Sequence, residues 1–213
     1  MDGVLFDSES RGLECFLLSC KEVGIEPKAE PYIATIGTTY TRSDEILMDF
    51  FKDEALFKKT MDYFNKIFRG SYPKGEIKLK KGAREIIQYL TDNDIPFALA
   101  TSSPLFIAEM SFINQGYKQI PFKYIMTGDN VVNSKPHPEI FNKAAQLMGL
   151  NPKDCMVIED SRNGIFAAQA TGGVAVLVPD IVPVDEDMIN AATYKLNDLV
   201  EVRKLVEKLI DRD

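Results

Sequence analysis

The stretch 155–178 reads CMVIEDSRNGIFAAQATGGVAVLV and contains two short, continuous apolar runs, at residues 155–158 and 174–178. Two similar runs precede it, FALAT at 97–101 and YIMT at 124–127. Continuous apolar runs of this length are typical of strands that are covered on both faces, as the strands of parallel sheets are. The sequence therefore predicts a buried parallel sheet in this part of the chain.

Helical patterns lie between and around these runs. Apolar side chains recur at helical spacing over residues 83–90, 140–148 and 199–209. Strands that alternate with helices indicate βαβ units. The predicted fold class is therefore α/β, with a doubly wound, Rossmann-like parallel sheet as its core.

Residues 11–75 have a different texture. Helical spacing of apolar residues recurs around 13–20 and 46–51, an aromatic-rich stretch covers 57–68, and Gly37, Pro73 and Gly75 interrupt the pattern. We predict a small α-helical cap domain at 11–75, inserted after the first strand of the sheet. Residues 1–10 and 76–213 then form the α/β core domain, whose first strand is truncated.

Composition excludes several classes of protein. The 213 residues include 25 Lys and Arg against 32 Asp and Glu, which gives a net charge of −7 and disfavours a partner made of nucleic acid or anionic membrane. The one histidine, His137, cannot build a zinc site that needs several histidines.

The cysteines and the N-terminus indicate where the protein resides. Cys15, Cys20 and Cys155 are odd in number and lack CxxC spacing, so we expect buried, reduced thiols. An acid at Asp2 is unlike a signal peptide, and no apolar run approaches the ~20 residues of a membrane helix. We expect a soluble, cytoplasmic protein.

Polar segments follow the predicted strands or lie in neighbouring loops. They are DGVLFDSE at 2–9, TSSP at 101–104, SKPHP at 134–138 and EDS at 159–161. Ligands of open α/β sheets bind at the carboxyl ends of the strands. We therefore expect these four segments to share one site.

Each segment offers a distinct chemical group. Glu159 and Asp160 are adjacent carboxylates that suit Mg²⁺. Thr101 supplies a hydroxyl beside a helix N-terminus, which favours an anion, and Lys135 supplies a positive charge for a phosphate. Asp2 can act as a general acid and then as a general base.

Structural interpretations compete with these roles. Asp7 is suited to the N-cap of the following helix, and 101–103 and 159–160 could cap helices as well. Lys135 alone could be a solvated loop lysine, and His137 between two prolines is better suited to shaping a turn than to catalysis. The co-occurrence of all four segments at one edge favours the functional interpretation.

These motifs, in this order, resemble those of the haloacid dehalogenase superfamily, in particular its β-phosphoglucomutase-like phosphatases with a small helical cap. The resemblance rests on DGVLFDSE at 2–9, LATSS at 99–103, KPHPEIF at 135–141 and VIEDSRNGI at 157–165, and it covers nearly the whole chain. It implies a Mg²⁺-dependent phosphatase, a phosphoric monoester hydrolase that acts on a small phosphorylated metabolite such as a sugar phosphate.

The resemblance also implies residue roles. Asp2 would be the acid/base and would offer its backbone carbonyl to the metal, Asp160 would be the carboxylate ligand, and Glu159 would support it directly or through water. Thr101, Ser102 and Lys135 would hold the phosphoryl oxygens.

One departure from the family pattern concerns the nucleophile. In the family this is an aspartate two residues before the position of Asp2, which would form an aspartyl-phosphate, and in this chain that position falls before Met1. We expect that the natural protein continues upstream of an internal Met1. The alternatives are a chain that lacks its nucleophile, and is then inactive or impaired, or a gap filled by another segment or a second molecule.

Two alternative functions follow. A β-phosphoglucomutase-like phosphomutase would need a second phosphate contact in the cap, for which Arg42 is the candidate, although Arg42 could equally be a surface residue. A chain without a nucleophile would be a non-catalytic phosphate-binding or regulatory protein. For either enzyme we expect a small phosphorylated substrate, no nucleic acid or membrane partner, and a monomer, with a dimer as the alternative.

Overall fold

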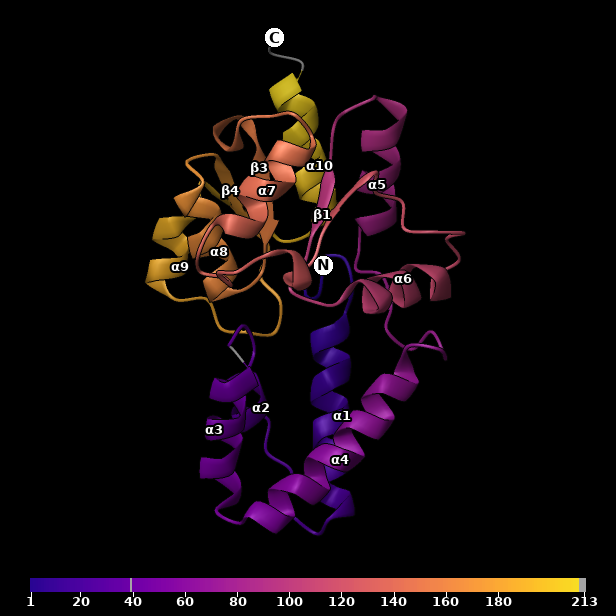
Figure 1. The fold of residues 1–213 in the computed structure, drawn as a ribbon, viewed down its shortest axis with the longest axis vertical. Helices are drawn as coiled ribbons and strands as arrows, with labels where there is room; N and C mark the ends of the chain where they lie inside the picture. The colour runs from indigo at the N-terminus through magenta and orange to yellow at the C-terminus, as the bar shows by residue number, and fades with distance from the viewer. Residues whose placement is uncertain (39, 211–213) are drawn as a thin grey trace.

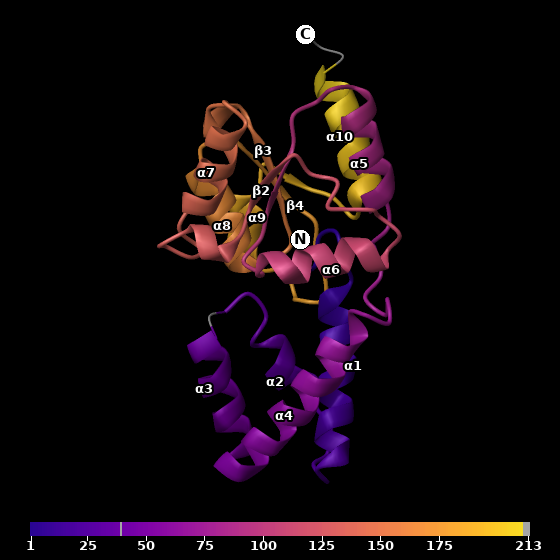
Figure 2. The ribbon, with the colours of Figure 1, turned by 45° about the vertical axis from the view of Figure 1, so that its right-hand side comes forward.

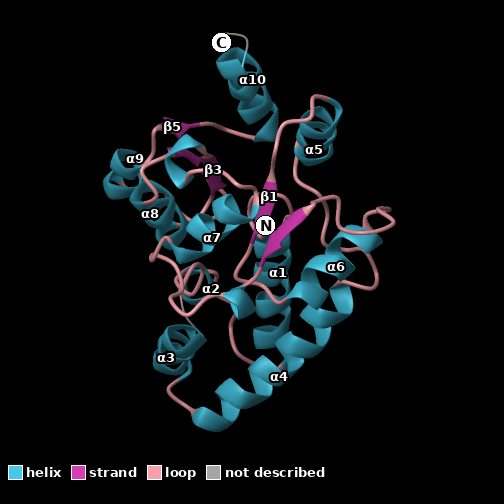
Figure 3. Cartoon of the chain, turned by 45° about the horizontal axis from the view of Figure 1, so that its top comes forward, coloured by secondary structure: helices cyan, strands magenta, loops and turns pink. Residues whose placement is uncertain are grey.

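The structure is a computed structural model that describes residues 1–38 and 40–210, and it consists of an α/β core and a helical cap (Figure 1). In Figure 1 the core occupies the upper half of the molecule, and helices α1 to α4 of the cap lie below it. Figure 3 shows the short strands enclosed by helices. The predicted fold class is confirmed.

The strands of the core are short and parallel. Strand β1 (Ala98–Ala100) pairs with β2 (Tyr124–Met126), with Leu99 opposite Ile125. Strand β3 (Met156–Glu159) pairs with β4 (Val174–Leu177), which also pairs with β5 (Tyr194–Lys195). The four predicted apolar runs are therefore strands, and β5 was missed because its two residues carry no apolar run.

Helices cover both faces of the sheets, as Figure 2 shows. Along β4, Val176 packs into one apolar cluster with helices α5, α6 and α10, whereas its neighbours Ala175 and Leu177 pack into the other with α7, α8 and α9. Successive side chains of a strand point to opposite faces, so both faces are buried. This explains why the strands appear as continuous apolar runs in the sequence.

The core helices that were predicted from the periodic spacing of apolar residues are present. The expected helices at 83–90, 140–148 and 199–209 are α5, α7 and α10, whereas α6, α8 and α9 were not predicted individually. The bounds are α5 (Ala83–Asp92), α6 (Leu105–Asn114), α7 (Glu139–Leu147), α8 (Arg162–Ala170), α9 (Glu186–Ala191) and α10 (Leu199–Ile210), with 3₁₀ turns η1 (Gly128–Asn130) and η2 (Pro152–Asp154).

The N-terminal residues form a turn. The backbone amides of Leu5 and Phe6 donate to the carbonyl oxygen of Met1 at 2.8 and 3.2 Å, and isolated bridges join Asp2 to Phe6 and Phe6 to Leu79. Among the described residues β1 pairs with β2 alone and β3 with β4 alone, so the sheet is in two parts. No strand precedes β1 in the described chain.

The cap contains helices α1 (Ser8–Glu22), α2 (Glu30–Ile33), α3 (Tyr40–Phe51) and α4 (Glu54–Ser71). They enclose an apolar cluster of their own, which includes Cys15, Phe16, Cys20, Leu47, Phe51 and Phe64. Helix α4 begins where the side chain of Asp53 accepts a hydrogen bond from the amide of Leu56 at 3.0 Å. The predicted helical insert is present, and its first helix begins at Ser8.

The two connections between core and cap run side by side. The amide of Asp7 donates to the carbonyl oxygen of Lys78 at 2.9 Å, and the amide of Lys80 donates to that of Leu5 at 2.8 Å. The cap is therefore attached to the core through a pair of hydrogen-bonded linkers.

The thiols are free, and Cys15 and Cys20 are buried as expected. Cys155 is only half-buried, which corrects the expectation for that residue, because it precedes β3 and its Sγ lies 3.4 Å from the carbonyl oxygen of Asn151. Over the described part of the chain, the helices are too short or too polar to cross a membrane.

Candidate active site

The polar segments predicted at the sheet edge meet there. The hydroxyl of Ser103, after β1, donates to Oδ2 of Asp2 in the N-terminal turn at 2.7 Å. Gly3 of the same turn lies against Asp160 after β3, and Lys135 forms an ion pair with Glu159. We refer to this group as the sheet-edge site, comprising Asp2, Thr101, Ser103, Lys135, Glu159 and Asp160.

Gly3 allows the N-terminal turn to approach β3. Its φ of +68° lies in the left-handed region, and a Cβ at this position would be 2.0 Å from Oδ2 of Asp160. The absence of a side chain therefore allows the Gly3 backbone to lie beside the Asp160 carboxylate. The motif Asp2-Gly3 thus has a steric reason for its glycine.

Lys135 and Glu159 form a buried ion pair. Their side chains are 15% and 6% exposed, and the ammonium of Lys135 also lies 4.9 Å from the centre of the Phe141 ring. Burial alone would raise the pKa of Glu159, but the Lys135 ammonium and the α-ammonium of Met1 hold it below its ordinary value. Glu159 is therefore a charged partner of Lys135.

Asp160 is the carboxylate at the site that is best suited to a cation. Burial, followed by the neighbouring Glu159 carboxylate, raises the pKa of Asp160 well above its ordinary value. A divalent cation would relieve both effects. Within the described residues no three Asp, Glu, His or Cys side chains gather to enclose a metal. Mg²⁺ commonly takes one or two carboxylates and keeps water ligands, so Asp160, with Glu159 beside it, fits Mg²⁺.

The segment after β1 is organised by its hydroxyls. Thr101 is 2% exposed, and its Oγ1 accepts a hydrogen bond from the amide of Ser103 at 3.1 Å. Ser102 is exposed, whereas Ser103 contacts Asp2. Sequence reasoning singled out Ser102 and missed Ser103, although the repeated serine in the TSSP segment was the available indication.

The structure shows which of the polar residues suggested as helix caps act as caps. Asp7 occupies the N-cap position of α1, but its side chain makes no capping hydrogen bond. Pro104 precedes α6, so the hydroxyls at 101–103 do not cap it. The hydroxyl of Ser161 caps α8 by accepting a hydrogen bond from Gly164 N at 3.2 Å, which leaves Glu159 and Asp160 free of that role.

Glu139 fixes the loop that carries Lys135. Its carboxylate accepts hydrogen bonds from the amides of Val132 and Asn133 at 3.0 and 2.9 Å. Together with the Lys143 ammonium, which has the largest effect, these amides lower the pKa of Glu139 to about 2. His137 is exposed, and its Nδ1 accepts a hydrogen bond from the amide of Glu139 at 3.2 Å, as expected of a residue that shapes the turn.

Arg42, the candidate substrate contact in the cap, forms an ion pair with a residue of its own helix. Its side chain on α3 is 63% exposed, and its guanidinium donates to Glu45 on the same helix at 2.8 Å. The structure therefore shows a surface ion pair at this position.

A second polar group, missed by sequence reasoning, surrounds the linkers. Lys80 pairs with Asp180 at 2.5 Å, and the hydroxyl of Tyr32 donates to Glu9 at 3.4 Å. Burial, followed by the charges of Asp2 and Asp180, raises the pKa of Glu9 to about 7. Glu9 belonged to the motif DGVLFDSE, but nothing in that pattern indicated its neighbours.

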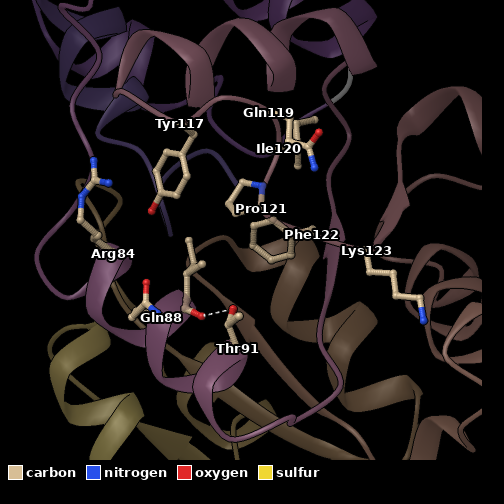
Figure 4. A pocket seen from close by; sticks show the side chains of 10 residues that line it. Arg84, Gln88, Thr91, Tyr117, Gln119, Ile120, Pro121, Phe122 and Lys123 are labelled. Atoms are coloured by element: carbon tan, nitrogen blue, oxygen red, sulfur yellow. Dashed lines mark hydrogen bonds between the residues drawn. The ribbon is translucent and has the colours of Figure 1, made fainter.

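A groove of about 570 Å³ lies elsewhere, between α5 and the segment that leads into β2 (Figure 4). There the Arg84 guanidinium lies 4.6 Å from the centre of the Tyr117 ring and donates to the carbonyl oxygen of Gln115 at 2.7 Å. None of the residues that line this groove belongs to the sheet-edge site. The groove is therefore separate from the candidate active site.

The fold and the sheet-edge site define a Rossmann-like α/β core with a helical cap and a polar site at the edge of its strands. Residues 1–178 match the family model of the haloacid dehalogenase-like hydrolases, and the chain belongs to this family. The resemblance read from the motifs is confirmed.

Relatives of similar sequence include several phosphatases. The chain is 29% identical over 176 residues to a phosphorylated carbohydrates phosphatase from Thermotoga maritima, a match that covers 81% of this chain and 79% of the relative. It is 33% identical over 146 residues, 67% of this chain, to a bifunctional riboflavin kinase/FMN phosphatase from Arabidopsis thaliana. It is 40% identical over 108 residues, 48% of this chain, to a probable pseudouridine-5'-phosphatase from Drosophila melanogaster. The matches span only 38% and 47% of the latter two relatives.

Solved structures share the fold. A putative β-phosphoglucomutase from Thermotoga maritima is 25% identical with a TM-score of 0.76, and the match covers 98% of this chain and 96% of that one. A family hydrolase from Deinococcus radiodurans, solved with bound phosphate and sodium, is 23% identical with a TM-score of 0.81, and the match covers 98% and 93% of the two chains. The core and the cap together are therefore the architecture of the family.

Proposed function

We propose that the protein is a Mg²⁺-dependent phosphatase that hydrolyses the phosphoric monoester of a small metabolite, most closely a sugar phosphate. The convergence of Asp2, Lys135 and Asp160 at one sheet edge carries the proposal, because it combines a proton donor, a phosphate counter-charge and a metal ligand. The chain is similar to a phosphorylated carbohydrates phosphatase over 81% of its own length and 79% of the relative's. This similarity supports a sugar phosphate as the substrate.

The nucleophile in this proposal is an aspartate two residues before Asp2. Asp2 contacts Ser103 after β1, and Gly3 contacts Asp160 after β3. Residues that lead into Asp2 can therefore run between β1 and β3 as a parallel strand, which would unite the two parts of the sheet. The aspartate at the end of such a strand would reach the same edge as Lys135 and Asp160.

The proposed reaction has two steps. The nucleophilic carboxylate attacks phosphorus while the ester P–O bond breaks, and Asp2, as the acid, gives its proton to the leaving oxygen. Water then attacks the aspartyl-phosphate, Asp2 takes up a proton from that water, and phosphate leaves as the carboxylate is restored. Ser103 holds the Asp2 carboxyl in place through its hydrogen bond.

Binding of the phosphoryl group is assigned to the remaining residues. Lys135 neutralises phosphoryl oxygens, and Thr101 and Ser102 supply polar groups after β1. Asp160, supported by Glu159 and by the backbone carbonyl of Asp2, would hold Mg²⁺, which would spread the charge that develops on the phosphoryl oxygens. Arg42 of the cap is assigned to the far end of the substrate.

The experiment compares this chain with one extended upstream in the reading frame, using p-nitrophenyl phosphate and a panel of sugar phosphates with Mg²⁺. We expect the extended chain to be active, and Asp160→Asn in that chain to lose at least a hundredfold in kcat. An extended chain that stays inactive on the whole panel would instead support a non-catalytic phosphate-binding protein. Conversion of one sugar phosphate isomer into another, without phosphate release, would identify the phosphomutase.

A further inference from the structure

The cap contacts the core beside the sheet-edge site as well as through its linkers. The side-chain amide of Asn163, near the start of α8, donates a hydrogen bond to the carbonyl oxygen of Gly37, in the segment after α2. Figure 1 shows this segment of the cap rising toward α8. Cap and core are thus joined by a hydrogen bond between residues far apart in the chain.

Gly37 is closely packed at this contact. Its φ is +73°, and a Cβ at this position would lie 3.3 Å from Cβ of Ser161. The hydroxyl of Ser161 lies in turn 3.4 Å from Oε2 of Glu159. The cap segment therefore rests directly on the residues that follow β3 and adjoin the pair of Glu159 and Lys135.

Most of the cap's helix packing is internal. Among the described helices and strands, α1–α4 make their larger contacts with one another, and the elements of the core do the same. At the linker end, Phe68 of α4 also packs against the core cluster. The linkers constrain one side of the cap through the hydrogen bonds of Asp7 and Lys80. The hydrogen bond between Asn163 and Gly37 joins cap and core away from these linkers, so it constrains the orientation of the cap independently of them.

We propose that Asn163 is a positioning residue that latches the cap over the sheet-edge site through Gly37. The latch favours the closed arrangement, in which the segment 34–38 covers Ser161 and restricts access of water to Glu159 and Asp160. Asn163 acts through the cap and takes no part in the chemistry. Its role in substrate binding rests on the proposed phosphatase function, whereas its role in holding the cap does not.

Three variants separate the hydrogen bond from the stability of α8. Asn163→Asp is nearly isosteric but presents carboxylate oxygens, which cannot donate to the Gly37 carbonyl, and an acid in the first turn of a helix favours the helix. Asn163→Ala removes the group altogether, and Asn163→Gln retains an amide donor. Gln169→Ala, at an exposed position on the same helix, is the matched control.

The first readout is amide hydrogen exchange in the cap segment, which requires no activity. The amides of Ile36 and Thr38 donate to the carbonyl oxygens of Ile33 and Thr35 at 3.2 and 3.1 Å, so their exchange reports local opening. We expect Asn163→Asp and Asn163→Ala to accelerate it about five- to tenfold, the factor that one net hydrogen bond contributes to an equilibrium. Asn163→Gln and Gln169→Ala should leave it within twofold, and the thermal midpoint of Asn163→Asp should not fall.

Unchanged exchange at Ile36 and Thr38 in Asn163→Asp would overturn the latch. Exchange that accelerates equally in β3 and β4 would also overturn it, because the contact would then stabilise the core as a whole. In an active extended chain, Asn163→Asp should raise KM five- to tenfold with kcat within twofold, because affinity falls with the fraction of closed molecules. An equal loss in kcat at unchanged KM would contradict the positioning role, and absence of any activity would bear only on the proposed function.

Discussion

Gly3 lies directly against the carboxylate of Asp160, so closely that a Cβ on Gly3 would fall 2.0 Å from Oδ2. The contact joins the N-terminal turn to the carboxyl end of β3. Because Asp2 precedes Gly3 and is held by Ser103, this one approach fixes the distance between the proposed acid/base and the proposed metal ligand. The glycine is therefore as much a part of the site as its charged neighbours.

Gly3→Ala should destabilise the protein by about 2–4 kcal/mol, the cost of a left-handed φ for alanine plus the displacement of Asp160. Gly24→Ala is the matched control, because Gly24 has a φ of +81° but nothing within 4 Å of a Cβ. The difference between the two variants in urea unfolding isolates the steric contact. Equal losses in both would show that Asp160 moves aside at no cost.

Lys135→Met should destabilise the protein by about 3 kcal/mol at pH 7, because Glu159 is left buried and charged without its partner. In the native protein the pKa of Glu159 is lowered from its ordinary value of 4.5, so the stabilisation is present above pH 4.5 and is lost as the pH falls through the lower folded value. The difference in unfolding free energy between Lys135→Met and the native protein should therefore shrink near pH 4. The double variant Lys135→Met/Glu159→Gln should recover most of the loss, and a double variant no more stable than the single one would contradict this explanation.

Glu9→Gln should change how stability depends on pH. The folded pKa of Glu9 is raised from 4.5 to about 7, so the folded protein binds more protons than the unfolded chain between these values and loses stability as the pH rises. The variant should match the native protein below about pH 4.5 and exceed it by roughly 3 kcal/mol above pH 7. Denaturant unfolding at pH 5 and pH 8 measures this, with Glu22→Gln, exposed on the same helix, as the control. If the stability of the native protein does not decrease from pH 5 to pH 8, the pKa of Glu9 is not raised.

Mg²⁺ should raise the thermal midpoint of the native chain at pH 7 and compete with protons for Asp160, whose pKa is raised by burial and by Glu159. At ten times its dissociation constant the ion would add about 1.4 kcal/mol of stability. Asp160→Asn should abolish the Mg²⁺-dependent shift while being more stable than the native chain in the absence of metal. Asp129→Asn changes an exposed acid that is distant in sequence from Glu159 and Asp160, and this variant should keep the Mg²⁺-dependent rise in thermal midpoint. A shift that survives in Asp160→Asn would assign the ion to another group.

The sequence predicted which segments meet at the sheet edge better than it predicted the contacts between their side chains. Asp2, Lys135 and Asp160 were each identified from motifs at strand ends, and the structure brings them to one edge. The sequence did not indicate that Ser103 contacts Asp2, because the path of the chain after β1 decides which of two adjacent hydroxyls faces Asp2. Glu9 and Asn163 stood in recognised motifs without a role, since their partners come from distant segments.

By itself the sequence determined the alternation of strands and helices, the helical insert and the set of polar groups at the strand ends. Burial of a strand on both faces leaves a continuous apolar run, as at 174–178, and a helix that buries one face leaves a periodic one, so both are visible locally. Only the tertiary structure decided that the strands form two separate sheets, that Gly3 meets Asp160 and that Asn163 meets Gly37. Such contacts depend on turns and on the placement of whole elements, which no local pattern of side chains records.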